Sequence, residues 1–306
     1  MCCSIRVSAI EGAVTMTVAG PVAKAPNALD AMRRFLRLNP TILVGLAVLA
    51  AFTLVALIAP YILPDPVRVN PIQRLFAPGA EFLFGTDQLG RSTLSRTLNG
   101  TRISLTIGAL VTLLTVGFGL LIGLVAGYVR WLDGTVMRVM DGLMAIPGIL
   151  LAIALMSLFG SSVQNVVIAI GVAEIPRMAR VVRSSVLVLR EQTYVEAAIT
   201  NGAGLPRMLL RHILPNAAAP VIVQATYVFA SAMIVESILS FLGAGTPPTI
   251  PSWGNMLAEA RPFMQRAPWM IAFPGVALAL LVLTVNVLGD ALRDAIDPRL
   301  ARKLRI

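Results

Sequence analysis

The chain has 306 residues, of which 57% are hydrophobic and only 13% are charged. A soluble domain carries about 25% charged residues, and a water-soluble core of this size could not hide so much apolar surface. The net charge of +10 would suit a nucleic-acid partner, but in a membrane protein such charge usually lies in the loops that set orientation. We therefore expect a lipid bilayer as the partner and no nucleic acid.

Residues 1–31 match no pattern of a folded segment, and we expect them to be a disordered cytoplasmic N-terminus. The two cysteines, Cys2 and Cys3, are adjacent, so they provide neither a disulfide framework nor a metal site. They follow no apolar segment of the kind found in lipoprotein signals. Met16 or Met32 would serve equally well as the start of the protein.

Five long runs contain no Asp, Glu, Lys or Arg: residues 40–63, 103–129, 142–173, 213–235 and 267–289. A helix needs about 20 apolar residues to span the hydrocarbon core, and buried helices of a soluble protein would be about half as long as these runs. The run 142–173 is too long for one span, and its polar middle, residues 159–165, predicts a break. The sequence therefore predicts an all-α membrane protein in residues 32–306, with six spans at about 41–63, 103–129, 142–159, 163–182, 213–236 and 267–289.

The basic residues support six spans with both termini in the cytoplasm. This topology places 18 of the 25 Lys and Arg residues inside and 7 outside, although the first outer loop itself contains five arginines. A five-span topology would put most of them outside unless the whole protein were inverted, against the positive-inside rule.

Small residues and prolines mark positions within the spans. Gly119, Gly123 and Gly127 are spaced four apart, so they lie on one face of the second span, where they allow close helix packing. Prolines in or near the spans remove backbone hydrogen bonds and are expected to kink them: Pro147, Pro176 and Pro274.

The most informative loop is residues 191–216, EQTYVEAAITNGAGLPRMLLRHILPN. Residues 191–200 contain few helix breakers, residues 201–204 suit a chain reversal, and residues 205–214 have helix-like composition with arginines on one side. A short amphipathic helix here would either dock onto a cytoplasmic partner or lie on the lipid headgroups, and periodicity leaves both open.

Within this loop, the order Glu-Ala-Ala, Gly and Leu-Pro resembles the EAA loop of the membrane subunits of ABC importers. The segment His-x-Leu-Pro-Asn, which places His212 where the general motif has Ile, is similar to the peptide-importing branch. In that family the loop forms a coupling helix in a groove of the ATPase subunit. The resemblance assigns this role to Glu196, Ala197, Ala198, Gly202, Ala203, Gly204, Leu205, Pro206, His212, Leu214 and Pro215.

Three further stretches resemble the dipeptide/oligopeptide permease branch, the branch of DppC and OppC. They are FGTDQLGR at residues 84–91, ESILSFLGAGTPPTIPSWG at 236–254 and LGDALRDAIDPRL at 288–300. Two positions depart from the branch: Ser92 stands where Asp is usual, and Gly204 replaces Ser or Thr. The second change weakens the predicted start of the coupling helix, because Gly caps a helix less firmly than Ser.

The resemblance implies a type I ABC importer permease in the bacterial inner membrane. Such a subunit forms the pathway with a related second permease, and works with two ABC ATPases and a periplasmic solute-binding protein. The cargo would be dipeptides or oligopeptides, with nickel chelates or other small solutes as the alternative.

No Gly-x-x-x-x-Gly-Lys-Ser/Thr phosphate loop occurs, so ATP and Mg²⁺ are expected on the ATPase subunits and no cofactor on this chain. The sequence also predicts no metal site and no catalytic residues, because His212 is its single histidine. An ATP-independent secondary transporter would need inverted repeats or an ion site in the spans.

Glu174 and Glu236 are the acids within or at the ends of spans, and intramembrane acids are functional candidates. Arg177 follows Glu174 by three residues and can pair with it. Glu236 is a candidate for the pathway, with a structural role as the other interpretation.

Overall fold

The computed structural model describes residues 5–10, 13–18 and 39–296, and it divides into two units, residues 1–40 and 41–306. In the first unit, β1 (Ile5–Ile10) and β2 (Ala13–Val18) form an antiparallel hairpin in which Ile5 pairs with Val18. The expectation of disorder for residues 1–31 differs from the structure over these two strands. Both strands are rich in β-branched residues, which favour extended backbone. The remaining residues of that range lie outside the described part of the chain.

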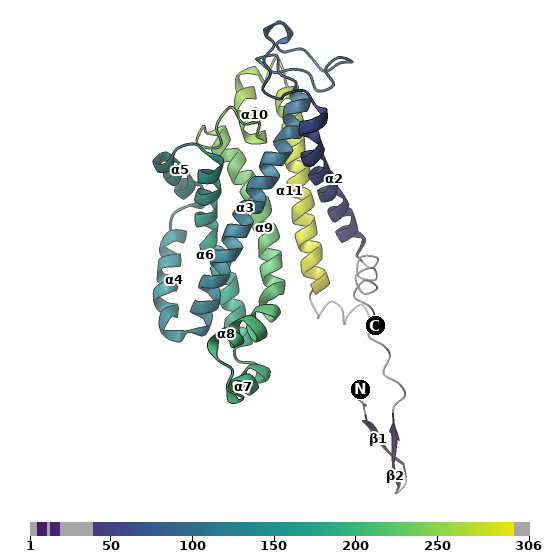
Figure 1. The fold of residues 1–306 in the computed structure, drawn as a ribbon, viewed down its shortest axis with the longest axis vertical. Coiled ribbons are helices and arrows are strands. Elements are labelled where there is room, and N and C mark those ends of the chain that lie inside the picture. Colours follow the sequence, from purple (N-terminus) through teal and green to yellow (C-terminus); the bar gives the residue numbers. More distant parts are fainter. Residues whose placement is uncertain (1–4, 11–12, 19–38, 297–306) are drawn as a thin grey trace. The chain divides into compact units, whose positions relative to one another are not determined.

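The second unit is helical over its described residues (Figure 1). Its elements in chain order are α2 (Pro40–Ile62), η1 (Pro71–Gln73), α3 (Thr93–Tyr128), α4 (Arg130–Met144), α5 (Gly148–Phe159), α6 (Val163–Leu189), α7 (Thr193–Thr200), α8 (Leu205–Arg207), η2 (Met208–Ile213), α9 (Leu214–Phe241), α10 (Trp253–Ala260), η3 (Arg261–Phe263) and α11 (Trp269–Ile296).

Four helical segments of the described chain are long and apolar enough to cross a membrane: residues 40–62, 93–128, 205–241 and 269–295. The pair α4 and α5 adds a fifth if it is counted as one span, although its two helices meet at 85°. Helix α6 is 27 residues long, but Glu174 and three arginines make it more polar than those segments. The coarse prediction of a helical membrane protein is confirmed, whereas six spans remain a prediction.

Two predicted spans differ most from the helices of the structure. Helix α3 begins ten residues before the predicted position 103, because Ser92 caps it by accepting a hydrogen bond from the N–H of Ser95. Polar residues in its first turns hide this start from a hydropathy criterion. The predicted span 142–159 is not one helix, since the chain bends at Pro147, where α5 begins. At 12 residues α5 is about 18 Å long, short of the bilayer core of about 30 Å.

Prolines have unequal effects on the helices. Pro147 lies at the bend between α4 and α5, as a kink would require. Pro176 and Pro274 lie inside α6 and α11, and both helices continue through them without a break.

The glycines of α3 form its contact with α6, which lies beside it along much of its length (Figure 1). A Cβ atom built on Gly123 would lie 2.5 Å from the Cβ of Val182 and 2.6 Å from the carbonyl oxygen of Ala179. Gly119 and Gly127 meet Met178 and Val186 at 2.3 and 2.7 Å in the same way. The predicted packing role of this stripe is confirmed.

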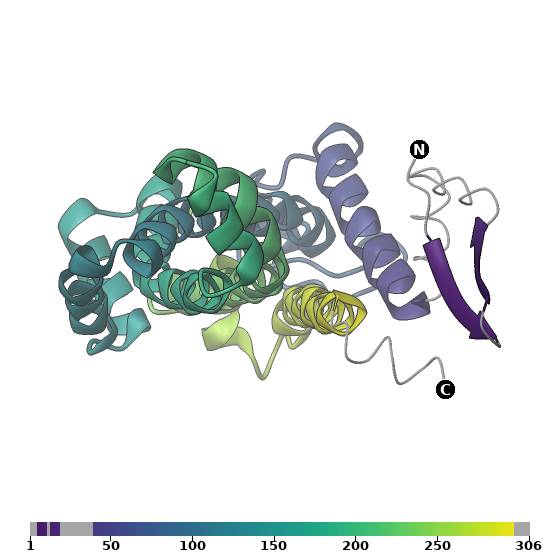
Figure 2. The ribbon, with the colours of Figure 1, turned by 90° about the horizontal axis from the view of Figure 1, so that it is seen from below.

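Helix α2 lies at one side of the bundle next to α11 (Figure 2). Its Gly45 approaches Leu288 of α11, and the ring of Phe52 packs edge-on against that of Trp253 at 6.2 Å. Several of its large apolar side chains are exposed, including Leu57 and Tyr61. These surfaces require lipid or another subunit to cover them.

The glycine contact makes a direct prediction for stability. Gly123→Ala forces a methyl group into the α3–α6 contact, and we expect overpacking to lower the free energy of unfolding by about 1–3 kcal/mol. The control is Gly117→Ala in the same helix, where a Cβ meets no atom within 4 Å. This control gains helix propensity and should be neutral or slightly stabilising. Thermal unfolding of the purified protein in detergent measures both, and equal midpoints would contradict the prediction.

Candidate functional site

Helix α7, which carries the Glu-Ala-Ala sequence, is capped at its C-terminal end by backbone hydrogen bonds. Helix α7 stops at Thr200, and Gly202 follows it with a φ of 77°. The N–H of Gly202 donates to the carbonyl of Ile199 at 2.9 Å, and the N–H of Ala203 donates to the carbonyl of Ala198 at 3.0 Å. This is the Schellman arrangement, which satisfies the last carbonyls of a helix and favours glycine at the left-handed position. A Cβ at Gly202 would meet nothing within 4 Å, so glycine is favoured here because of the positive φ and not because a side chain would clash.

The predicted helix 205–214 is not a separate element. Helix α8 leads through the π-helical turn η2 directly into α9, so residues 205–241 form one continuous helical segment. Pro215 has no N–H to donate to Arg211, and a widened turn accommodates the missing bond. Gly204 precedes α8 without a side-chain cap, as its replacement of Ser or Thr implies. The break predicted at 201–204 lies where expected.

The loop has a buried side and an exposed side. Val195, Met208 and Ile213 are fully buried in the main apolar core, to which Val182 and Val186 of α6 also belong. The side chains of Ile199 and Leu210 are 51% and 63% exposed. The remaining predicted coupling residues divide in the same way: Glu196, Ala197, Gly202, Gly204, Leu205, Pro206 and Pro215 are exposed, whereas Ala198, Ala203, His212 and Leu214 are half-buried.

Glu236 is fully buried near the end of α9. Its carboxylate accepts hydrogen bonds from Ser240 at 2.9 Å and Thr246 at 3.4 Å, and Thr246 in turn contacts Ser252 at 3.1 Å. Asn255 of α10 donates to Thr246 Oγ1 at 3.0 Å. Through these hydrogen bonds Glu236 links the end of α9 to the loop that leads into α10. Its role in the pathway stays a prediction.

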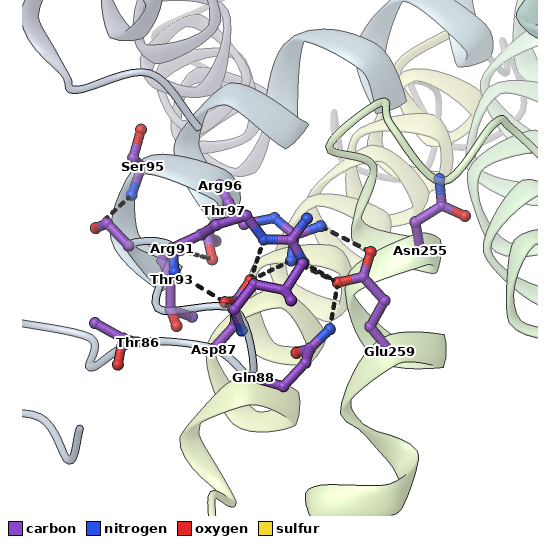
Figure 3. Close-up of polar contacts among 12 residues, drawn as sticks. Thr86, Asp87, Gln88, Arg91, Thr93, Ser95, Arg96, Thr97, Asn255 and Glu259 are labelled. Carbon is purple, nitrogen blue, oxygen red and sulfur yellow. Dashed lines mark hydrogen bonds and ion pairs between the residues drawn. The ribbon is translucent and has the colours of Figure 1, made fainter. Parts of the chain in front are cut away.

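A network of four charged residues lies near α10, at the end of the bundle opposite α7 (Figures 1 and 3). Arg96 Nη1 bonds to Asp87 Oδ2 and to Glu259 Oε2, each at 2.7 Å. Arg91 Nε bonds to Asp87 Oδ2 at 2.5 Å, and its Nη2 contacts Glu259, to which Gln88 also donates at 3.0 Å. This network joins the start of α3 to α10, and sequence reasoning missed it because the partners are far apart in the chain.

Burial and charge act in opposite directions on Glu259. Burial raises its pKa, but the hydrogen bond from Arg96 and the charges of Arg96 and Arg91 outweigh it, so the pKa is held below its ordinary value of 4.5. The side chain of Glu259 is 20% exposed, and that of Arg96 is 3% exposed. The carboxylate therefore remains charged at neutral pH and compensates two buried guanidinium groups.

Tight turns position this network. Gly90 has a φ of 72°, and a Cβ there would lie 1.8 Å from the carbonyl oxygen of Asn70. The N–H groups of Leu89 and Arg91 donate to Asp87 Oδ1 at 2.8 and 2.9 Å. Ser92 caps α3, a role that Asp performs equally well, which explains the departure at this position.

Comparisons with known proteins identify the family. Residues 117–302, more than half of the chain, match the family described as binding-protein-dependent transport system inner membrane component. The chain belongs to this family. Residues 28–78 match the N-terminal transmembrane domain of oligopeptide transport permease C, so the predicted branch is confirmed.

No group of three His, Cys, Asp or Glu among the described residues could hold a metal ion.

Relatives of this permease cover most of its length. A probable peptide ABC transporter permease of Sinorhizobium fredii is 50% identical and covers 88% of this chain and 93% of its own. The dipeptide transport permease DppC of Alkalihalophilus pseudofirmus is 43% identical, covering 87% and 88%. The glutathione transport permease GsiD of Pectobacterium atrosepticum is 44% identical, covering 88% and 90%.

The permease shares its fold with a chain of the methionine ABC transporter MetNI, solved in inward-facing conformations. The TM-score is 0.56 at 19% identity, over 66% of this chain and 97% of that chain.

The ionic network predicts a pH-dependent stability. Glu259→Gln replaces charge-assisted hydrogen bonds to Arg96 and Arg91 with neutral ones and should lower the free energy of unfolding by about 1.5–3 kcal/mol at pH 7. Because the folded-state pKa is lowered, the contribution of Glu259 is present above its ordinary pKa and is lost as the pH falls through the folded value. The gap in unfolding midpoint between wild type and variant should therefore shrink from pH 6 toward about pH 3.

The control for this prediction is Glu81→Gln, which alters an exposed carboxylate that accepts a hydrogen bond from Gln73 at 3.3 Å. We expect a change of less than about 0.5 kcal/mol for the control at every pH. A gap for Glu259→Gln that does not change with pH would contradict the ionic explanation.

Proposed function

We propose that this chain is a permease subunit of an ATP-driven, binding-protein-dependent importer of peptides. Its family supplies the type of transport system, and the printed names of several relatives give peptides or dipeptides as cargo. Glutathione, the cargo named for another relative, is itself a tripeptide, which supports the same class. Nickel chelates or other small solutes remain the alternative cargo.

The proposed topology has six spans and both termini in the cytoplasm. The spans are α2, α3, the bent pair α4 and α5, α6, α9 and α11. In support, six spans place most of the basic residues inside. The loop of α7 then lies on the cytoplasmic side, and the network around Glu259 lies on the periplasmic side.

We propose that the loop of α7 docks onto an ABC ATPase. The observation that carries this proposal is the division of the loop into a buried base and an exposed tip. Val195 and Met208 anchor the base in the same core as Val182 and Val186, so a push on the tip would reach α6. Exposed Ile199 and Leu210 offer the ATPase an apolar surface in a compact knob.

The proposed assembly contains this chain, a related second permease, two ATPase subunits and a periplasmic solute-binding protein. ATP and Mg²⁺ would bind to the ATPases. Import requires that ATP and cargo stabilise different conformational states of the assembly. A ligand shifts a conformational equilibrium only when it binds one state more tightly than the other.

Cysteine cross-linking tests the docking. With Cys2 and Cys3 replaced by serine, Ala197→Cys on exposed α7 should cross-link to the ATPase in membranes that contain the whole transporter, because the proposed interface covers it. ATP should change the cross-linking yield as the two ATPases close.

The matched control is Ser161→Cys, which is also exposed but lies between α5 and α6, and it should give no ATPase adduct. A transporter that imports peptides normally after residues 193–204 are replaced by a flexible linker would rule out the proposed role of this loop.

A further inference from the structure

Arg177 and Glu174 lie in helix α6, toward the cytoplasmic end of the span predicted at residues 163–182. At a rise of 1.5 Å per residue, Arg177 lies about 21 Å from the start of this span at Val163 and about 8 Å from its predicted end at residue 182. A charged side chain within a span is costly when it faces lipid, and such residues face the bundle interior or a water-filled cavity.

Arg177 is unlike the next two arginines along α6. Arg180 pairs with Asp141 at 2.5 Å, and Arg183 bonds to Asp133 at 2.5 and 2.6 Å, so both are directed to α4. Those contacts have a sufficient structural explanation, since they fasten an amphipathic helix to α6.

Arg177 instead lies on the face that α6 shares with α9. Its Nη1 bonds to Glu174 Oε2 at 3.1 Å and to the hydroxyl of Tyr227 at 3.4 Å, and its guanidinium lies 5.4 Å from the centre of the Tyr227 ring. Ser231 of α9 donates to Glu174 at 3.4 Å.

The guanidinium group retains unused donors. Among the described residues, all its hydrogen bonds run through Nη1, whereas Nε and Nη2 belong to a side chain that is 45% exposed. Glu174 is only 13% exposed and is engaged by both helices. The exposed group of this cluster is therefore the cationic guanidinium of Arg177, which the carboxylate of Glu174 and the ring of Tyr227 hold in place.

We infer that Arg177 is a carboxylate-binding subsite in the wall of the translocation pathway, where it takes the C-terminal carboxylate of a passing peptide. This inference rests on the proposed function. Nε and Nη2 together match the two oxygens of a carboxylate, and every unmodified peptide carries that group whatever its sequence. Glu174 beside it weakens the attraction, so the site binds a peptide and then releases it, as a pathway requires.

Transport of two related probes tests the inference. The complete transporter is reconstituted in proteoliposomes, and uptake is measured for radiolabelled alanyl-phenylalanine and for its C-terminal amide. The same binding protein delivers both probes to every variant, so its own preference cancels in the ratio of variant to wild type.

Arg177→Gln should slow uptake of the free acid about tenfold, because a charge-assisted hydrogen bond is lost, and slow uptake of the amide less than about twofold. Arg180→Gln, which removes the same charge one turn away, should leave the ratio of acid to amide unchanged. An equal loss for both probes, or no loss, overturns the inference. Wild-type transporter that imports neither peptide would instead overturn the proposed function.

A second measurement tests the aqueous location without relying on transport. With Cys2 and Cys3 replaced by serine, Tyr227→Cys should react with a charged, water-soluble methanethiosulfonate reagent. Ile168→Cys is the control, since Ile168 is 44% exposed but lies nine residues before Arg177, on the opposite face of α6. Equal reactivity at the two positions, or no reaction at Tyr227→Cys, overturns the inference.

Discussion

The close contact between α3 and α6 is the constraint on which the other features depend. Three glycines of α3 leave no room for a Cβ against Met178, Val182 and Val186. Since the hydrophobic effect gives no force between helices in lipid, van der Waals packing of this kind holds the bundle together. Helix α6 carries Glu174, Arg177, Arg180 and Arg183 and leads into α7. Its fixed position against α3 therefore locates both features.

Charge is distributed along the bundle according to what compensates it. Near α10, two arginines and two carboxylates form a mostly buried network that ties the start of α3 to a segment about 160 residues later. Along α6, Arg180 and Arg183 are paired with α4. Arg177 instead pairs with Glu174 of its own helix and contacts Tyr227 of α9, and its side chain is 45% exposed.

The loop around α7 combines rigidity with exposure. The Schellman bonds and the positive φ of Gly202 close the end of α7, while Met208 and Ile213 lie in the core. A segment built in this way can transmit a displacement, because close-packed interiors move as units and do not absorb strain gradually. The same property would be lost in a flexible connection of equal length.

The sequence by itself determined the membrane class, the glycine packing face and the position of the chain reversal at residues 201–204. These are local properties, because hydropathy, residue spacing and glycine conformation act over a few neighbouring residues. It also indicated the family through short motifs that the comparisons confirmed. The kink at Pro147 and the pairing of Arg177 with Glu174 are local features that the sequence also predicted. Only the tertiary structure decided the ionic network around Glu259, the contact of Arg177 with Tyr227 and the particular residues of α6 that the glycines of α3 meet. Those features depend on groups that are distant in the chain and become neighbours only when the helices pack.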